Sequence, residues 1–270
     1  MFRTTTIALL SLPSLALAQG SFYGFQKTNT SNAADWGLVE VNATPFDGST
    51  TRLPTASFSL SDLTFDASGT LWAQNSDKLA TVDVTTGAVS NIARIVAPSE
   101  PSTFLQVQDM AFAPNGTLYA TGQYLSGGSL VEGLYTIDTA TAQATIVAEG
   151  GFGTFGFDGL AFTLDGRLIA SEIGGIREID PADGSVIATL PLGISDALSL
   201  TVDPITGLGY AVGFAGANYN TLYEIDFGTN SAAQIATLDE AIWDLAATPA
   251  PGAITLFGAA GLVGFRRRRA

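Results

Sequence analysis

The stretch that decides the fold is Glu240-Ala-Ile-Trp-Asp-Leu-Ala-Ala247, near the end of the 270-residue chain. Its Asp244-Leu245 pair matches Asp62-Leu63, which opens a repeated block much earlier in the sequence. A lone copy of a repeat's first strand at the far end predicts a ring that this strand closes.

The repeated block contains four short segments with turn residues between them. Its first segment carries Leu63, Met110, Leu160 and Leu200, and with Leu245 these positions are separated by 47, 50, 40 and 45 residues. A second segment reads Gly69-Thr-Leu-Trp-Ala-Gln74 in one unit, and a third reads Lys78-Leu-Ala-Thr-Val-Asp83. Four alternating strands in about 45 residues are typical of one blade of a β-propeller.

The chain begins its repeats out of phase. The first unit starts at its second strand, residues 20–25, and lacks a first strand, which residues 240–247 supply. We therefore predict an all-β, five-bladed β-propeller over residues 19–248 that the C-terminal strand closes, leaving no free edge at the seam. A sandwich of irregular strands is the alternative.

Both ends of the chain have the character of targeting segments. Residues 1–18 combine an apolar run with a final Ala16-Leu17-Ala18, the small-residue pattern of a signal-peptide cleavage site. We expect export by the Sec pathway, with a short buried helix as the alternative. Residues 252–265 carry no charge and precede Arg266-Arg267-Arg268-Arg269. They are short for a membrane span of about 20 residues, but arginines can snorkel, so we expect a C-terminal transmembrane helix.

The last 22 residues, 249–270, resemble a known sorting signal. The order Pro249-Ala250-Pro251, apolar segment and terminal Arg cluster looks like the PEP-CTERM signal, although Ala250 stands where that family has Glu. The resemblance implies a transient anchor in the inner membrane and recognition by an exosortase-like enzyme. It also implies delivery to the cell surface or extracellular matrix, where such proteins accompany exopolysaccharide in biofilms. A plain tail anchor is the alternative.

Composition excludes several kinds of chemistry. The chain has no Cys and no His, so disulfides, thiolate sites and Ser-His-Asp triads are absent. Residues 19–248 contain all 25 acidic residues and only six of the basic ones, a net charge of −19. This surface repels nucleic acid and other anionic polymers and attracts cations such as Ca²⁺.

Acidic residues precede the first strand of several blades. Asp62, Asp109 and Asp244 come one residue before its Leu or Met, and Asp158 comes two before. These side chains would converge at one mouth of the central channel, where carboxylates bind Ca²⁺ or repel one another. The alternative is that each carboxylate accepts hydrogen bonds from the backbone that enters its own strand.

Other polar and aromatic residues favour structural roles or loop contacts. Tyr23, Trp72, Tyr119 and Tyr210 share one repeat position, where packing between blades is a better explanation than sugar stacking. Asx residues that end the third strands are expected to form turns. Ligand contact is expected instead from residues in or beside the loops on the acidic mouth: Trp36, Tyr124, Asn218 and Tyr219.

Two functions from different classes remain open at this point. The first is a non-catalytic surface or matrix propeller that binds a polysaccharide or has a structural role. The second is a Ca²⁺-dependent hydrolase or lyase of a sugar or lactone, with the acidic residues holding the metal. The blades resemble YVTN, NHL and gluconolactonase-like repeats in general pattern only, and this resemblance implies no catalytic residue.

Overall fold

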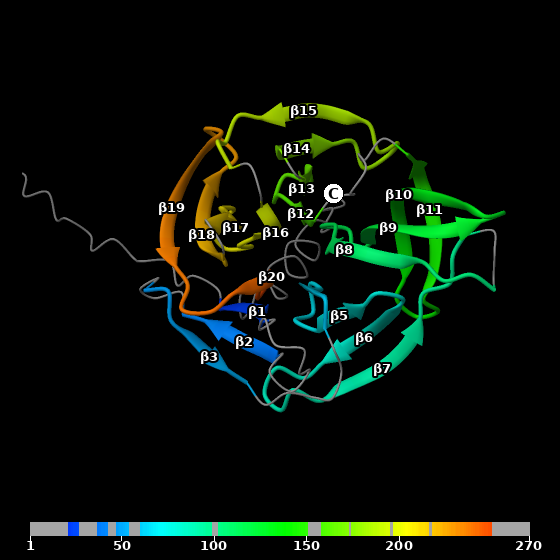
Figure 1. The fold of residues 1–270 in the computed structure, drawn as a ribbon, viewed down its shortest axis with the longest axis horizontal. Coiled ribbons are helices and arrows are strands. Elements are labelled where there is room, and N and C mark those ends of the chain that lie inside the picture. The colour runs from blue at the N-terminus through cyan, green and yellow to red at the C-terminus, as the bar shows by residue number, and fades with distance from the viewer. Residues whose placement is uncertain are drawn as a thin grey trace, which may run out of the picture.

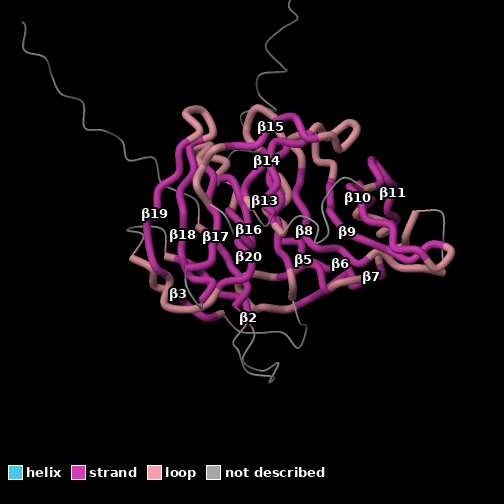
Figure 2. Tube along the Cα trace, turned by 45° about the horizontal axis from the view of Figure 1, so that its top comes forward, coloured by secondary structure: helices cyan, strands magenta, loops and turns pink. Residues whose placement is uncertain are grey.

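The structure is a computed structural model that describes residues 21–26, 37–42, 47–53, 60–98, 102–150, 158–172, 174–194, 197–215 and 218–249. Over these ranges the chain forms strands, turns and loops, and Figure 2 shows no helix. No helix in the described part is long and apolar enough to cross a membrane. The signal peptide and the C-terminal segment from residue 250 onward lie outside the described residues and stay predictions.

The described strands form five four-stranded antiparallel sheets around a central axis (Figure 1). From the axis outward, blade 1 contains β20 (Ile242–Ala247), β1 (Phe22–Gln26), β2 (Gly37–Val41) and β3 (Thr50–Arg52). Blade 2 contains β4 (Asp62–Phe65), β5 (Leu71–Asn75), β6 (Lys78–Val82) and β7 (Val89–Arg94). Blade 3 contains β8 (Gln106–Phe112), β9 (Leu118–Ser126), β10 (Ser129–Asp138) and β11 (Gln143–Glu149). Blade 4 contains β12 (Gly159–Phe162), β13 (Leu168–Glu172), β14 (Gly175–Ile179) and β15 (Val186–Leu190). Blade 5 contains β16 (Ala197–Val202), β17 (Gly209–Ala215), β18 (Asn218–Asp226) and β19 (Ser231–Thr237).

The predicted five-bladed propeller with its closing strand is confirmed. Strand β20 pairs antiparallel with β1, from Phe22 opposite Ala247 to Phe25 opposite Asp244. The first strand of the sequence and the last one therefore share one sheet. The sandwich alternative is wrong, since the five inner strands contact one another in a ring and not across two layers (Figure 1).

The core is divided into five clusters of buried side chains, one at each interface between neighbouring blades. At the seam between blades 5 and 1, for example, Ile242 packs with Phe22, Val39 and Tyr210, all 1% exposed or less. A blade alone leaves one apolar face open to water, so each blade depends on its two neighbours for burial.

The repeated aromatic position packs between blades, as predicted. The ring of Tyr23 lies 5.8 Å from that of Phe65 in the next blade, and Trp72 lies 6.1 Å from Phe112. The same arrangement brings the ring centroids of Tyr119 and Phe162 to 5.2 Å of each other. Tyr210 instead meets Phe22 across the seam at 4.7 Å. These side chains form the contacts that hold one sheet on the next.

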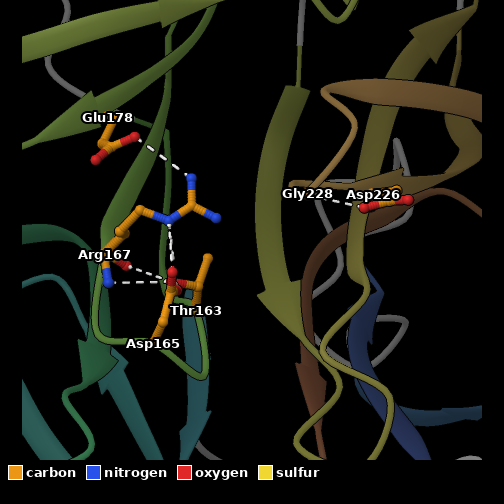
Figure 3. A network of polar contacts seen from close by, with 6 residues as sticks. All are labelled: Thr163, Asp165, Arg167, Glu178, Asp226 and Gly228. Atoms are coloured by element: carbon orange, nitrogen blue, oxygen red, sulfur yellow. Dashed lines mark hydrogen bonds and ion pairs between the residues drawn. The ribbon is translucent and has the colours of Figure 1, made fainter.

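We name the two ends of the propeller. The hairpin face is the end with the turns between first and second strands and between third and fourth strands. The ring face is the opposite end, where the inner strands begin. On the hairpin face, Asp226 Oδ1 accepts hydrogen bonds from the amides of Gly228 and Thr229 (Figure 3). The predicted Asx turns are confirmed here and at three further Asp residues, Asp83, Asp138 and Asp180. At Asn42 the side-chain amide donates to Ser49 Oγ instead.

The turn between β12 and β13 on this face adds a polar network (Figure 3). Arg167 forms ion pairs with Asp165 at 3.1 Å and with Glu178 on β14 at 3.4 Å. The Asp165 carboxylate also accepts a hydrogen bond from Thr163 Oγ1. These contacts tie the inner hairpin of blade 4 to its third strand.

Replacing Ile242 by alanine tests whether the closing strand is held by its packing. Removing a buried Ile side chain costs about 2–5 kcal/mol, which lowers the melting temperature of a domain of this size by roughly 5–15 °C. Ile187→Ala is the matched control, because Ile187 on the outer strand β15 is 58% exposed. Thermal unfolding by circular dichroism makes the comparison. Equal melting temperatures for the two variants would contradict the closure.

Candidate site at the ring face

One position recurs near the start of each inner strand, and we call these five residues the ring positions. They are Asp62, Asp109, Gly159, Ser199 and Asp244 in blades 2, 3, 4, 5 and 1. Each comes one residue before the buried Leu or Met of its strand. The side chains at four of the five ring positions are polar, and all four are 3% exposed or less. The sequence therefore places polar groups where the fold is most fully buried.

A local irregularity sets the direction of three ring side chains. In β8, β16 and β20 the pairing with the second strand shifts register immediately before Asp109, Ser199 and Asp244. A β-bulge at such a place turns the strand and re-aims the following side chain. In β4 and β12 the strand itself begins at the ring position, so no bulge is needed.

Ring side chains form hydrogen bonds from one blade to the next. Ser199 Oγ accepts the Leu245 amide at 2.8 Å and donates to Asp244 Oδ1 at 2.8 Å. Asp244 Oδ2 in turn accepts the amide of Leu63 in blade 2. The pattern links blades 5, 1 and 2 through side chains, in addition to their apolar packing.

The close approach of blade 5 explains the glycine in blade 4. A Cβ atom at Gly159 would lie 2.4 Å from Ser171 Oγ and 2.9 Å from the Leu200 amide nitrogen. No side chain fits there without moving the neighbouring backbone. The ring is thus acidic in blades 1 to 3 and uncharged in blades 4 and 5.

Three of the four predicted acidic residues come together. Each of Asp62, Asp109 and Asp244 has a carboxylate oxygen within 4.8 Å of the other two, and we call them the acidic cluster. Asp158 is outside this cluster and is half-buried. The prediction that the acids converge is confirmed for the cluster, and whether it binds a metal stays a prediction.

Burial dominates the electrostatics of the acidic cluster. Removal from water raises the pKa of Asp62 and of Asp109 well above the usual range, and the charge of Asp244 raises both further. Burial also raises the pKa of Asp244, to about 6, although hydrogen bonds from Ser199 and Leu245 favour its charged form. The side-chain hydrogen bond between Asp62 and Asp244 raises the pKa of Asp62 and lowers that of Asp244, so Asp62 is the one of these two that holds the shared proton.

The predicted ligand-contact residues do not form one site among the described residues. Tyr124 is 4% exposed and packs edge-on against Tyr135, with ring centroids 6.3 Å apart, so core packing accounts for it. The segment expected to be a loop around it belongs to the long hairpin of β9 and β10, whose turn is Gly127-Gly128. Asn218 and Tyr219 begin β18, opposite Ala215 and Phe214. Trp36 lies outside the described residues.

Sequence reasoning missed two residues that belong beside the acidic cluster. Ser199 aligns with Asp62 in the repeat, and this alignment was a signal that could have identified it. Gln74 lies one residue before the end of the second strand of blade 2, directly opposite Asp62, and it is 1% exposed. Only the strand pairing reveals Gln74, because it is twelve residues away in sequence.

Comparison with known proteins supports the fold and nothing finer. No protein-family model matches the sequence, and no curated protein does. A gluconolactonase from Xanthomonas campestris is similar in structure, with a TM-score of 0.53 and 13% identity, over 77% of this chain and 73% of that one. TolB from Acinetobacter baumannii gives a TM-score of 0.51 and 15% identity, over 82% of this chain and 54% of its own. At these identities the likeness shows the β-propeller fold alone.

The pKa directions predict how stability depends on pH. The folded acidic cluster holds protons that the unfolded chain releases above about pH 4. With EDTA present, the cluster therefore contributes its full stability below that pH. This contribution is lost as the pH rises through the raised pKa values of the three aspartates. Asp62→Asn removes one of the repelling charges, so we expect it to melt at a higher temperature than the unmodified protein at pH 8.

The control is Asp183→Asn on the hairpin face. The hydrogen bonds of Ser185 lower the pKa of Asp183, so its contribution has the opposite sign and is lost as the pH falls. Melting curves from pH 4 to pH 8 measure both variants. If the melting temperature of Asp62→Asn followed the same pH dependence as that of the unmodified protein, the raised pKa of Asp62 would be contradicted.

Proposed function

We propose that this chain is an exported β-propeller of the cell surface or extracellular matrix that binds polysaccharide or another matrix component without catalysing a reaction. The observation that carries the proposal is where the two ends of the propeller lie. Strands β1 and β20 are neighbours, and the Thr248 amide donates to the Ser21 carbonyl at 2.8 Å. The segments that precede and follow the propeller therefore leave it side by side, on the hairpin face.

The terminal sequences support an anchored state. Pro249 follows directly after the last hydrogen-bonded residues, so the PEP-CTERM-like signal begins with almost no linker. One or two extended residues span only about 7 Å, so an anchored propeller would keep its hairpin face near the inner membrane. An exosortase-like enzyme would then release it to the surface. The ring face would point away from the membrane in the anchored state.

Burial of the acidic cluster supports a non-catalytic role. The alternative, a Ca²⁺-dependent hydrolase or lyase of a sugar or lactone, requires its substrate to reach the metal ligands. The three carboxylates are 1–3% exposed, so a sugar ring in solution does not reach them in the folded chain.

Charge restricts the partner. A net charge of −19 over residues 19–248 repels acidic polysaccharides and nucleic acids at low salt. We therefore propose a neutral polysaccharide as the ligand class. A glycan array probed with the purified protein tests this, and selective binding to uronic-acid polymers would overturn it.

Deleting residues 249–270 tests the sorting proposal. We expect the truncated protein to be exported and to appear in the medium, with at least tenfold less of it on the cells, as measured by immunoblotting of fractions. An unchanged melting temperature shows that the truncation leaves the propeller intact. Normal surface association of the truncated protein would contradict the proposal.

Single cysteines test the proposed orientation, because the chain has none of its own. Ser68 lies in the turn between β4 and β5 on the hairpin face, and Ser129 begins β10 on the ring face; both are exposed. In the anchored form, a fluorophore on Ser68→Cys should be quenched by a lipid-borne quencher and one on Ser129→Cys should not. The reverse result would show that the ring face lies against the membrane.

A further inference from the structure

The acidic cluster joins three consecutive blades at their inner strands. Asp244 comes from the closing strand β20, Asp62 from β4 and Asp109 from β8. One carboxylate oxygen of each lies within 4.8 Å of the other two, a separation that ligands of a single ion adopt. The ion pairs of Arg94, Arg167 and Arg177 are made to other carboxylates.

The hydrogen bonds at the cluster are too few for three charged carboxylates. The single Leu63 amide serves both Asp62 Oδ1, at 2.7 Å, and Asp244 Oδ2. Asp109 accepts the amides of Met110 and Leu160. Asp62 Oδ2 is buried and accepts no hydrogen bond from a described residue, and the side chain pairs with Asp244 only while it holds a proton. An unpartnered buried carboxylate oxygen is costly, so the ionised cluster favours a bound cation there.

A neutral side chain gives a second and separate indication. Gln74 is the cross-strand partner of Asp62, so both side chains stand on the same face of the blade. Its Nε2 donates to the carbonyl of Gln108, the residue before Asp109, at 3.4 Å, so this side chain reaches from the cross-strand neighbour of Asp62 to the strand that carries Asp109. Gln74 Oε1 is buried and has no partner either. Two unpaired acceptors therefore lie where three acids meet.

We propose that Asp62, Asp109 and Asp244, together with the amide oxygen of Gln74, bind one Ca²⁺ ion that holds the inner strands of blades 1, 2 and 3 together. Three carboxylates that bind through one or both oxygens, together with one amide oxygen, offer roughly four to seven of the six to eight oxygens that Ca²⁺ takes in varied geometry. Mg²⁺ is less suited, because it retains several waters and demands a regular octahedron. Zinc and copper prefer nitrogen or sulfur ligands, and the chain has no His or Cys. This role is structural and does not depend on the proposed polysaccharide binding.

Binding only to the folded state stabilises it by mass action. At a Ca²⁺ concentration 100-fold above Kd, a domain of this size should melt about 5–10 °C higher than it does in EDTA. The full-length protein, purified in detergent and dialysed against trace Ca²⁺, should carry one Ca²⁺ per chain by plasma mass spectrometry. Equal concentrations of MgCl₂ should give a clearly smaller shift.

The variants separate loss of the ion from loss of the fold. Asp62→Asn and Asp109→Asn should lose the bound Ca²⁺ and the Ca²⁺-dependent shift, yet unfold cooperatively in EDTA. Gln74→Met keeps all three carboxylates and should weaken Ca²⁺ binding several-fold. Asp158→Asn is the matched control, because this half-buried residue on the same face lies outside the cluster and should retain the ion.

Three results would overturn the proposal. The first is a purified protein that carries no Ca²⁺ and whose melting temperature does not change in millimolar CaCl₂, which would mean that protons alone neutralise the cluster. The second is full retention of Ca²⁺ in Asp62→Asn and Asp109→Asn, which would place the ion among exposed acids. The third is loss of the ion in Asp158→Asn as well. Failure of polysaccharide binding would leave all of these measurements unaffected.

Discussion

The pairing of β20 with β1 is the constraint on which the rest of the structure depends. It turns a row of blades into a ring, supplies the inner strand of blade 1 and brings Asp244 beside Asp62. The approach is so close that a Cβ atom at Gly24 would lie 2.7 Å from Ile242 Cγ2 and 3.0 Å from the Asp244 carbonyl. A glycine is needed at that position because two strands from opposite ends of the sequence meet there.

Much of this architecture could be predicted from sequence because it follows from periodic burial. Strand alternation, the turn residues and the Asp244-Leu245 match to Asp62-Leu63 indicated the blades and their closure. The directions of side chains near the axis were harder, since a register shift before Asp109 or Asp244 depends on tertiary packing. The long insertion from Tyr124 to Glu132 favours a loop, whereas the structure has there the end of a long hairpin that buries Tyr124.

The acidic cluster shows how the side chains of a repeat diverge within one chain. The ring position comes directly before the buried Leu or Met of every inner strand, yet it carries an acid in blades 1 to 3, glycine in blade 4 and serine in blade 5. Cross-blade hydrogen bonding explains why Ser199 and Asp244 are polar. It does not explain three carboxylates in one buried cluster, because three like charges destabilise the folded chain unless protons or a cation neutralise them.

The position of the closing strand also determines how the ring responds to force. The chain leaves β20 at Ala247, which is opposite Phe22 at the start of β1. Tension on the chain beyond Ala247 therefore acts across the ladder of hydrogen bonds and opens them one after another, instead of shearing them together. A pull from the C-terminal side would separate β20 from β1 starting at the Ala247–Phe22 pair. A load on any other blade is shared by a closed circle of interfaces between blades.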